Sequence, residues 1–433
     1  MKTNLWTVAL LVGLLGLSLW QLLSDESGIR RESARIGETP VWVYRPQGAD
    51  PAPLVVVAHG FAGSRRLMEP LALALAGRGY IAVTYDFLGH GRHPQPMRGN
   101  LEAEDGTTAY LLQQTDEVVR GAARLPGGDG RVALAGHSMA TDVLVRYAQD
   151  GASLVPAGTS ETPAMSQDST PQPRIEATVG ISMFAPTVGA TSPSNLLAIV
   201  GAWEGRLITE GRRVVSMTAG VEPDAVSPGT TYGDTDAGTA RRLAIAPGVE
   251  HVGVLYSATT LEETVHWLDD SLGRSVESRS PSEVPTRARG RGLWIALLMA
   301  VVFLLARPLA GALPRVSPAP LGASASWRRL LLVGGLPALV TPLILRPLPT
   351  GFLPVVVGDY VAVHFLTVGL LTGLLLWWTG GRPGKERLTQ VVLGSDPAGA
   401  VTRTVLGAAL TLSFFLLLVA WPLDRFFTSF MPV

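Results

Sequence analysis

A serine between two small residues is the first feature of this sequence that suggests chemistry. In "LAGHSMATD" (134–142), Ser138 follows an apolar run, with Gly136 two positions before it and Ala140 two positions after it. Small residues at these positions allow a tight turn from a strand into a helix. Such a turn exposes the hydroxyl and directs the helix N-terminus toward a developing oxyanion. Strand-to-helix turns of this kind also occur without catalysis, so a hydrolytic serine still needs a base and an orienting acid.

The surrounding region, from about residue 30 to 275, alternates between apolar runs and amphipathic stretches. The β-branched run "PLVVVAHG" (53–60) predicts a strand that is buried on both faces, and residues 108–125 carry their apolar side chains on one helical face. The full set of predicted strands is 40–46, 53–60, 80–86, 131–136, 176–186, 195–203 and 241–248, and the predicted helices are 68–79, 108–125, 139–150 and 259–272. This alternation predicts an α/β fold with a doubly wound, mostly parallel sheet.

Three motifs in this region resemble those of the α/β-hydrolase superfamily, in its lysophospholipase- and serine-aminopeptidase-like branch. The residues around Ser138 resemble the nucleophile elbow G-x-S-x-G, with alanine in place of the last glycine. "HGFAGS" (59–64) follows a predicted strand as the oxyanion loop of the family does, and "YDFLGHGRHP" (85–94) resembles its D-x-x-G-H-G turn. The resemblance covers about residues 40–272. It implies an α/β-hydrolase domain over 36–272 that acts as a serine hydrolase, esterase- or lipase-like, with a peptidase as a further option.

The resemblance also implies the site residues, because the family places serine, acid and histidine in that chain order. Ser138 would be the nucleophile. Glu204 falls where the acid belongs, although the family more often has aspartate there, and His251 falls where the general base belongs. The backbone N–H groups of Phe61 and Met139 would form the oxyanion hole. Neither a cofactor nor a metal is expected.

Two questions stay open at this stage. Three aspartates in a loop are alternative acids: Asp224, Asp234 and Asp236. A different function is also compatible with the sequence: a catalytically inactive hydrolase-like module that binds a ligand or partner on a membrane scaffold or transport bundle. The remaining histidines and the aspartate of the turn are expected to be structural, namely His59, Asp86, His90, His93, His137 and His266.

Five apolar segments are long enough to be considered as membrane spans: 5–23, 292–313, 330–345, 352–378 and 404–423. We predict an N-terminal anchor or signal in 1–24, a linker in 273–291 and a helix bundle in 292–433. Asp359 and His364 are ionisable groups at expected membrane depth. The hydrolase domain carries two polar excursions, 151–174 and 219–239.

Arginine and lysine in the short loops predict the orientation of the bundle. Basic residues gather in two loops, namely Arg315, Arg328 and Arg329 in the first and Arg382, Lys385, Arg387 and Arg403 in the second. Placing both loops inside puts the hydrolase domain outside, although Arg287, Arg289 and Arg291 on that outer side oppose this assignment. We predict an integral protein of a bacterial inner membrane, with the domain on the extracytoplasmic face.

Composition limits the partners further. The 433 residues include 35 basic and 35 acidic side chains, so nothing predicts a nucleic-acid partner. The chain has no cysteine, which excludes disulfides and a cysteine nucleophile. The expected partners are a small or lipid-like acyl substrate and the membrane, and no oligomeric state is predicted.

Overall fold

The computed structural model describes residues 5–48, 51–99, 106–150, 173–273, 290–314, 326–348, 358–380 and 397–427. The chain divides into two compact units. One contains Val12–Val301 and Leu423–Val433, and we call it the sheet unit. The other contains Met1–Leu11 and Val302–Pro422, and we call it the helical unit. The two are described separately.

Within the described residues, the sheet unit is built on a nine-stranded sheet of order β1-β2-β4-β3-β5-β6-β7-β9-β8. The pairs from β4 through β3, β5, β6 and β7 to β9 are parallel, whereas β1, β2 and β8 join antiparallel. The strands are β1 (Ile29–Ile36), β2 (Thr39–Pro46), β3 (Ala52–Ala58), β4 (Ile81–Tyr85), β5 (Gly128–His137), β6 (Ile175–Ile181), β7 (Leu196–Gly201), β8 (Thr231–Tyr232) and β9 (Arg241–Ala246).

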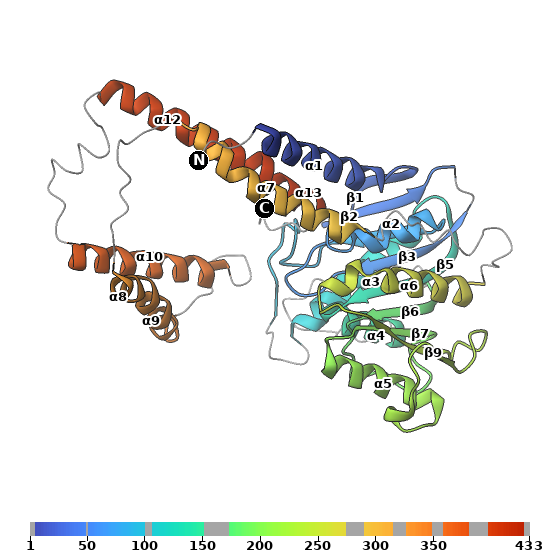
Figure 1. The fold of residues 1–433 in the computed structure, drawn as a ribbon. Coiled ribbons are helices and arrows are strands. Elements are labelled where there is room, and N and C mark those ends of the chain that lie inside the picture. Colours follow the sequence, from blue (N-terminus) through green and yellow to red (C-terminus); the bar gives the residue numbers. More distant parts are fainter. Residues whose placement is uncertain are drawn as a thin grey trace. The chain divides into compact units, whose positions relative to one another are not determined.

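Helices cover both faces of this sheet (Figure 1). Leu71 of α2 and Leu261 of α6 belong to the buried cluster on one face. Val118 of α3 and Leu144 of α4 belong to the cluster on the other face, which Val214 of α5 and its neighbours extend. All of β3 is buried, as expected of a central parallel strand between two helical layers. The helices are α2 (Glu69–Gly77), α3 (Thr107–Ala123), α4 (Met139–Asp150), α5 (Gly205–Ala219) and α6 (Ala258–Ser271).

Four of the described elements were not predicted from the sequence pattern: an edge strand, a helix, a short strand and a short 3-10 helix. The edge strand β1 is rich in charged residues and only half buried, so it lacks the apolar signal of an inner strand. Helix α5 has Gly211 in its middle, and a Cβ there would lie 2.6 Å from Leu243 Cδ1, so this glycine allows close packing on the sheet. The excursion 219–239 holds β8 and a short 3-10 helix (Pro223–Ala225). Residues 151–172 of the other excursion lie outside the described residues.

A cluster of buried ion pairs involves the ends of two further helices, α1 (Leu5–Ser24) and α7 (Arg291–Ala312), and a third helix, α13 (Trp421–Phe426), adds Arg425 at 3.8 Å from Glu69. Glu69, at the start of α2, accepts hydrogen bonds from Arg291 at 2.7 Å, Arg31 at 2.7 Å and Arg66 at 3.0 Å. Arg291 also pairs with Asp25 at 3.4 Å. Burial would raise the pKa of Glu69, but the surrounding arginines outweigh it and hold this pKa below its ordinary value. We call these six residues the Glu69 cluster.

The position of Arg291 differs from the sequence-based expectation. The predicted linker 273–291 includes this arginine, but Arg291 is the first residue of α7 and is fully buried. Its charge is neutralised by Glu69 and Asp25, which come from distant parts of the chain. Residues 274–289 of the linker lie outside the described residues.

Five helices of the described residues are long and apolar enough to cross a membrane: Leu5–Ser24, Arg291–Ala312, Trp327–Leu345, Asp359–Thr379 and Val401–Phe426. Within the helical unit, α9 (Leu336–Leu345) is followed by α10 (Gly358–Gly380), and Thr372 of α10 donates to the Val333 carbonyl at 3.4 Å. Asp359 lies at the start of α10 and is buried. The ring of His364 packs against Tyr360, with centroids 6.0 Å apart.

Replacing Glu69 with glutamine tests the contribution of the Glu69 cluster. The substitution keeps the side-chain size but leaves buried Arg291 without its closest carboxylate, and breaking a buried pair in this way costs about 3 kcal/mol. We expect the free energy of unfolding of the full-length protein to fall by that amount in denaturant titrations followed by tryptophan fluorescence. Glu32→Gln is the control, because Glu32 pairs with Arg30 at the surface and such pairs contribute less than about 1 kcal/mol. Equal losses in the two variants would contradict the prediction.

Candidate active site

Ser138 lies at a strained turn between β5 and α4. Its φ of +53° is in the left-handed region, which is unfavourable for a residue with a Cβ. The Ser138 N–H donates to the Ile181 carbonyl of the neighbouring strand at 2.9 Å. A Cβ on Gly136 would lie 3.2 Å from the Cβ of Ala140, so the two small positions approach closely. The turn therefore has the geometry of a nucleophile elbow.

The structure brings Ser138, His251 and Glu204 together in a chain of hydrogen bonds. His251 Nε2 and Ser138 Oγ are 2.8 Å apart, and His251 Nδ1 and Glu204 Oε1 are 2.5 Å apart. Because a carboxylate only accepts, Nδ1–H donates to Glu204 and Nε2 is left to accept the Ser138 hydroxyl proton. This tautomer is the one in which the imidazole acts as a base toward the serine.

The carboxylate of Glu204 is fixed on both of its oxygens. Oε2 accepts the Gly201 N–H and the Ser182 hydroxyl, each at 2.7 Å, while Oε1 faces His251. Burial would raise the pKa of Glu204, but the hydrogen bonds from His251, Ser182 and Gly201 hold it below its ordinary value. The group therefore remains a carboxylate at neutral pH.

Ser182 is a site residue that the sequence does not reveal. It follows β6 directly, is buried, and has a φ of +49°. Its N–H donates to the Ile199 carbonyl at 2.7 Å, so the residue is held by the backbone while its hydroxyl reaches Glu204. No motif or spacing marks this serine, because its contact depends on how two neighbouring strands end.

The loop that carries His251 is held from two sides. His137 is buried and its Nε2–H donates to the His251 carbonyl at 2.7 Å. Burial lowers the pKa of His137 to about 4, so its ring is neutral and adds no competing charge. Glu250 accepts the N–H groups of Val252 at 2.8 Å and Gly253 at 2.7 Å, so this neighbouring carboxylate stabilises its own turn.

The expected oxyanion loop lies directly against Ser138. A Cβ on Gly60 would lie only 2.9 Å from the Cβ of Ser138, so only glycine fits there. His59 Nε2 accepts the Phe87 N–H at 3.0 Å, and its Nδ1–H donates to the Gly60 carbonyl at 2.7 Å. Both ring nitrogens of His59 are therefore used in holding this loop. Phe61 comes next in the loop, and Met139 is the first residue of α4.

The D-x-x-G-H-G turn contributes to the loop scaffold. Asp86 accepts the backbone N–H of Arg65 at 2.7 Å and that of Arg92 at 3.1 Å, so one carboxylate ties two loops together. His90 Nδ1 lies 2.9 Å from the Leu88 carbonyl within the turn.

The alternative acids lie elsewhere in the structure. Asp224 is in a short 3-10 helix and lies 3.5 Å from Arg212. Asp234 accepts the N–H groups of Asp236 and Ala237 within its own turn. The carboxylate in contact with His251 is that of Glu204.

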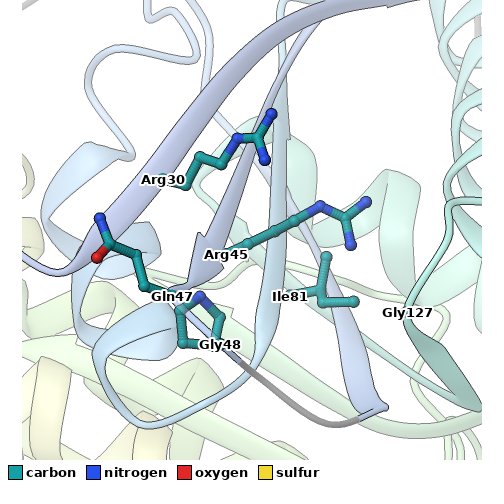
Figure 2. A pocket seen from close by; sticks show the side chains of 7 residues that line it. Arg30, Arg45, Gln47, Gly48, Ile81 and Gly127 are labelled. Atoms are coloured by element: carbon teal, nitrogen blue, oxygen red, sulfur yellow. The ribbon is translucent and has the colours of Figure 1, made fainter.

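A separate pocket lies at the opposite edge of the sheet (Figure 2). Ile81 begins β4, and Gly127 directly precedes β5, so the pocket is at the amino ends of these strands. Ser138, Glu204 and His251 instead follow the carboxyl ends of β5, β7 and β9. The lining residues are Arg30, Arg45, Pro46, Gln47, Gly48, Ile81 and Gly127. Across the described residues, no group of three or more His, Asp or Glu side chains is arranged to hold a metal ion.

Comparisons with known proteins concern the fold. Residues 53–185 match the family model of the alpha/beta hydrolase fold. No curated protein matches the chain. Similar solved structures include an esterase from Thermogutta terrifontis (14% identity, 59% of this chain and 96% of that chain, TM-score 0.40) and a dienelactone hydrolase from Anabaena variabilis (16% identity, 56% and 97%, TM-score 0.36). The family match and the mostly parallel nine-stranded sheet within the described residues define an α/β-hydrolase fold.

The hydroxyl of Ser182 can be tested with two substitutions. Ser182→Ala removes one hydrogen bond to a charged group, which is worth about 1.5 kcal/mol, and we expect kcat to fall about tenfold with little change in KM. Ser182→Gly also removes the hydroxyl but suits the positive φ. Comparable losses in both variants would assign the effect to the hydroxyl. Activity that stays at the wild-type level in either variant would contradict a role for the hydroxyl.

The pH dependence follows from the contact between His251 and Glu204. Hydrogen bonding to Glu204 raises the pKa of His251 above its ordinary value, so the imidazole stays protonated to a higher pH. Only the neutral ring can accept the serine proton. We therefore expect kcat/KM to rise with pH through one ionisation with a midpoint above about 6.5. Glu204→Gln should lower both the midpoint and the plateau in a pH–rate profile, and an unchanged midpoint would contradict this assignment.

Proposed function

We propose that this protein is a membrane-anchored serine hydrolase that cleaves an ester, thioester or amide through an acyl-serine intermediate. The observation that carries the proposal is the chain of hydrogen bonds from Ser138 through His251 to Glu204. The strained position of Ser138, at the carboxyl edge of an α/β-hydrolase sheet, supports the same function.

The chemistry follows from the direction of these hydrogen bonds. Ser138 Oγ attacks the carbonyl carbon of the substrate while its proton passes to His251 Nε2. The bond to the leaving group then breaks, and His251 gives its proton to that group. A water molecule attacks the acyl-serine ester with its proton going to His251, and collapse of this intermediate releases the acid and returns the proton to Ser138.

The backbone N–H groups of Phe61 and Met139 would stabilise the oxyanion. Met139 N–H belongs to the first turn of α4, where the helix dipole favours negative charge. The Phe61 N–H belongs to the loop that Gly60 brings against Ser138. Both N–H groups belong to backbone whose position is fixed without substrate. Such preorganised donors stabilise a developing oxyanion effectively.

Among the described residues, the site is open toward substrate. The connection from Ser182 to Asn195 between β6 and β7 contains no helix or strand in the structure, so this described stretch forms no helical cap. The side chain of His251 is 45% exposed, whereas that of Glu204 is 6% exposed. A substrate can therefore reach the imidazole and the serine while the acid remains shielded.

Membrane attachment is part of the proposal. The five helices that are long and apolar enough to span a bilayer support it. The basic residues of the two loops described above favour an extracytoplasmic hydrolase domain on a bacterial inner membrane.

Ser138→Ala tests the proposed function. Loss of the nucleophile should lower ester hydrolysis by about 1,000-fold or more and abolish labelling by a fluorophosphonate probe. The purified full-length variant should keep its unfolding transition, which confirms that the fold is intact. If the wild-type protein is folded but neither labelled nor active, the enzyme proposal fails and the inactive binding module takes its place.

A further inference from the structure

Four exposed apolar side chains surround the candidate triad. They are Phe61 (47% exposed), Phe184 (59%), Trp203 (71%) and Val252 (37%). Among the described residues from 29 to 273, the other large apolar side chains with this exposure are Met217 and Val221, both near the end of α5. Single exposed apolar residues need no explanation, but a group gathered at one site does. We call the four residues the apolar rim.

Each member of the apolar rim is next to a residue of the triad or in contact with its supports. Phe61 follows Gly60, which lies against Ser138. The backbone N–H of Phe184 donates to the Thr141 hydroxyl, in the first turn of α4, at 3.1 Å. Phe61 and Phe184 therefore belong to the two segments that contact the Ser138 turn.

The other two members border the histidine and the acid. Trp203 precedes Glu204, and its N–H donates to the Val249 carbonyl in the His251 loop at 3.2 Å. Val252 follows His251 directly. Because β3, β6, β7 and β9 are parallel, the segments that follow them meet at the carboxyl edge of the sheet. All four side chains therefore belong to the edge that carries Ser138.

Three helices that are apolar enough to span a membrane have ends in the sheet unit, and the end of α13 contacts loops at the same edge. The Asp424 carbonyl of α13 accepts from Arg66 Nε at 3.0 Å, and its carboxylate pairs with Arg92 at 2.6 Å. Arg66 follows the oxyanion loop, and Arg92 belongs to the D-x-x-G-H-G turn. The ring of Phe427 stacks on Tyr256, five residues after His251, with centroids 6.4 Å apart.

The ends of α1 and α7 complete this attachment. Leu22 of α1, Ile295 and Leu298 of α7, and Phe426 of α13 form one buried apolar cluster. Arg291, at the start of α7, is fixed to Glu69. The ends of α7 and α13 therefore lie near segments that follow the candidate catalytic loops, whereas α1 leads into β1, whose first residue pairs with Pro46 at the amino edge of the sheet.

We propose that the apolar rim binds the acyl chain of a membrane lipid ester, which reaches Ser138 from the bilayer surface. This inference rests on the proposed serine hydrolase function. Within the sheet unit, the ends of α7 and α13 pack near loops of the candidate site, and an exposed tryptophan is typical of a membrane–water interface. An acyl chain also matches the rim chemically, because each methylene that leaves water strengthens binding by about fourfold.

The test compares chain-length selectivity in purified full-length protein. Wild-type kcat/KM should be higher for p-nitrophenyl octanoate than for p-nitrophenyl acetate. In the double variant Phe184→Ser/Trp203→Ser, we expect the ratio of octanoate to acetate kcat/KM to fall at least tenfold. The control is Met217→Ser/Val221→Ser, which removes two apolar side chains, each 40% exposed, away from the rim and should leave both values within twofold of wild type.

A second arm identifies the source of the acyl chain. Reconstituted into phosphatidylglycerol vesicles, the wild-type protein should release fatty acid, and the rim variant should release it at least tenfold more slowly. Turnover of a soluble octanoyl thioester without any release from vesicles would overturn the lipid assignment. An unchanged selectivity ratio in the rim variant would overturn the rim itself while Ser138-dependent activity survives. Failure of the wild-type protein on every substrate, without fluorophosphonate labelling, would overturn the serine hydrolase proposal instead.

Discussion

The carboxylate of Glu204 is the group on which the geometry of the site depends. It contacts the base through one oxygen and receives two hydrogen bonds from the ends of β6 and β7 through the other. A glutamate has one more torsion than an aspartate, so its carboxylate must be restrained at more points to hold an imidazole in one orientation. Ser182 and the Gly201 N–H supply that restraint. The glutamate at position 204 is thus accompanied by two contacts that fix its carboxylate toward His251.

Local sequence signals predicted the strands of the parallel sheet and the position of Ser138, since both depend on short-range patterns such as the apolar run of β3 and the small residues around the turn. The candidate triad was predicted from the order of serine, acid and histidine along the chain, which resembles that of the α/β-hydrolase superfamily. Elements that depend on distant partners were not predictable in this way. Edge strand β1 takes its place by pairing with β2, and the role of Ser182 depends on a residue from the next strand.

Arg291 illustrates the same limit for electrostatics. In the sequence it is the third arginine of the basic stretch 287–291, and a positive charge there argues against placing the hydrolase domain outside the membrane. In the structure its charge is compensated by Glu69, which lies 222 positions earlier, and by Asp25 at the end of α1. Burial without those partners would be very unfavourable. A count of charges along a chain does not show which of them meet, so the fully buried arginine and its carboxylates were found only from the fold.

The contact between Arg66 and Asp424 also affects the order of assembly. The two residues are separated by 358 positions, so the loop beside the nucleophile emerges from the ribosome long before its partner is translated. Arg92 also donates a hydrogen bond to Asp424, so its partner is likewise translated much later. The contacts that Asp424 makes with these loops therefore form only once the helix Val401–Phe426 has been made, which couples maturation of the fold to biogenesis of that helix.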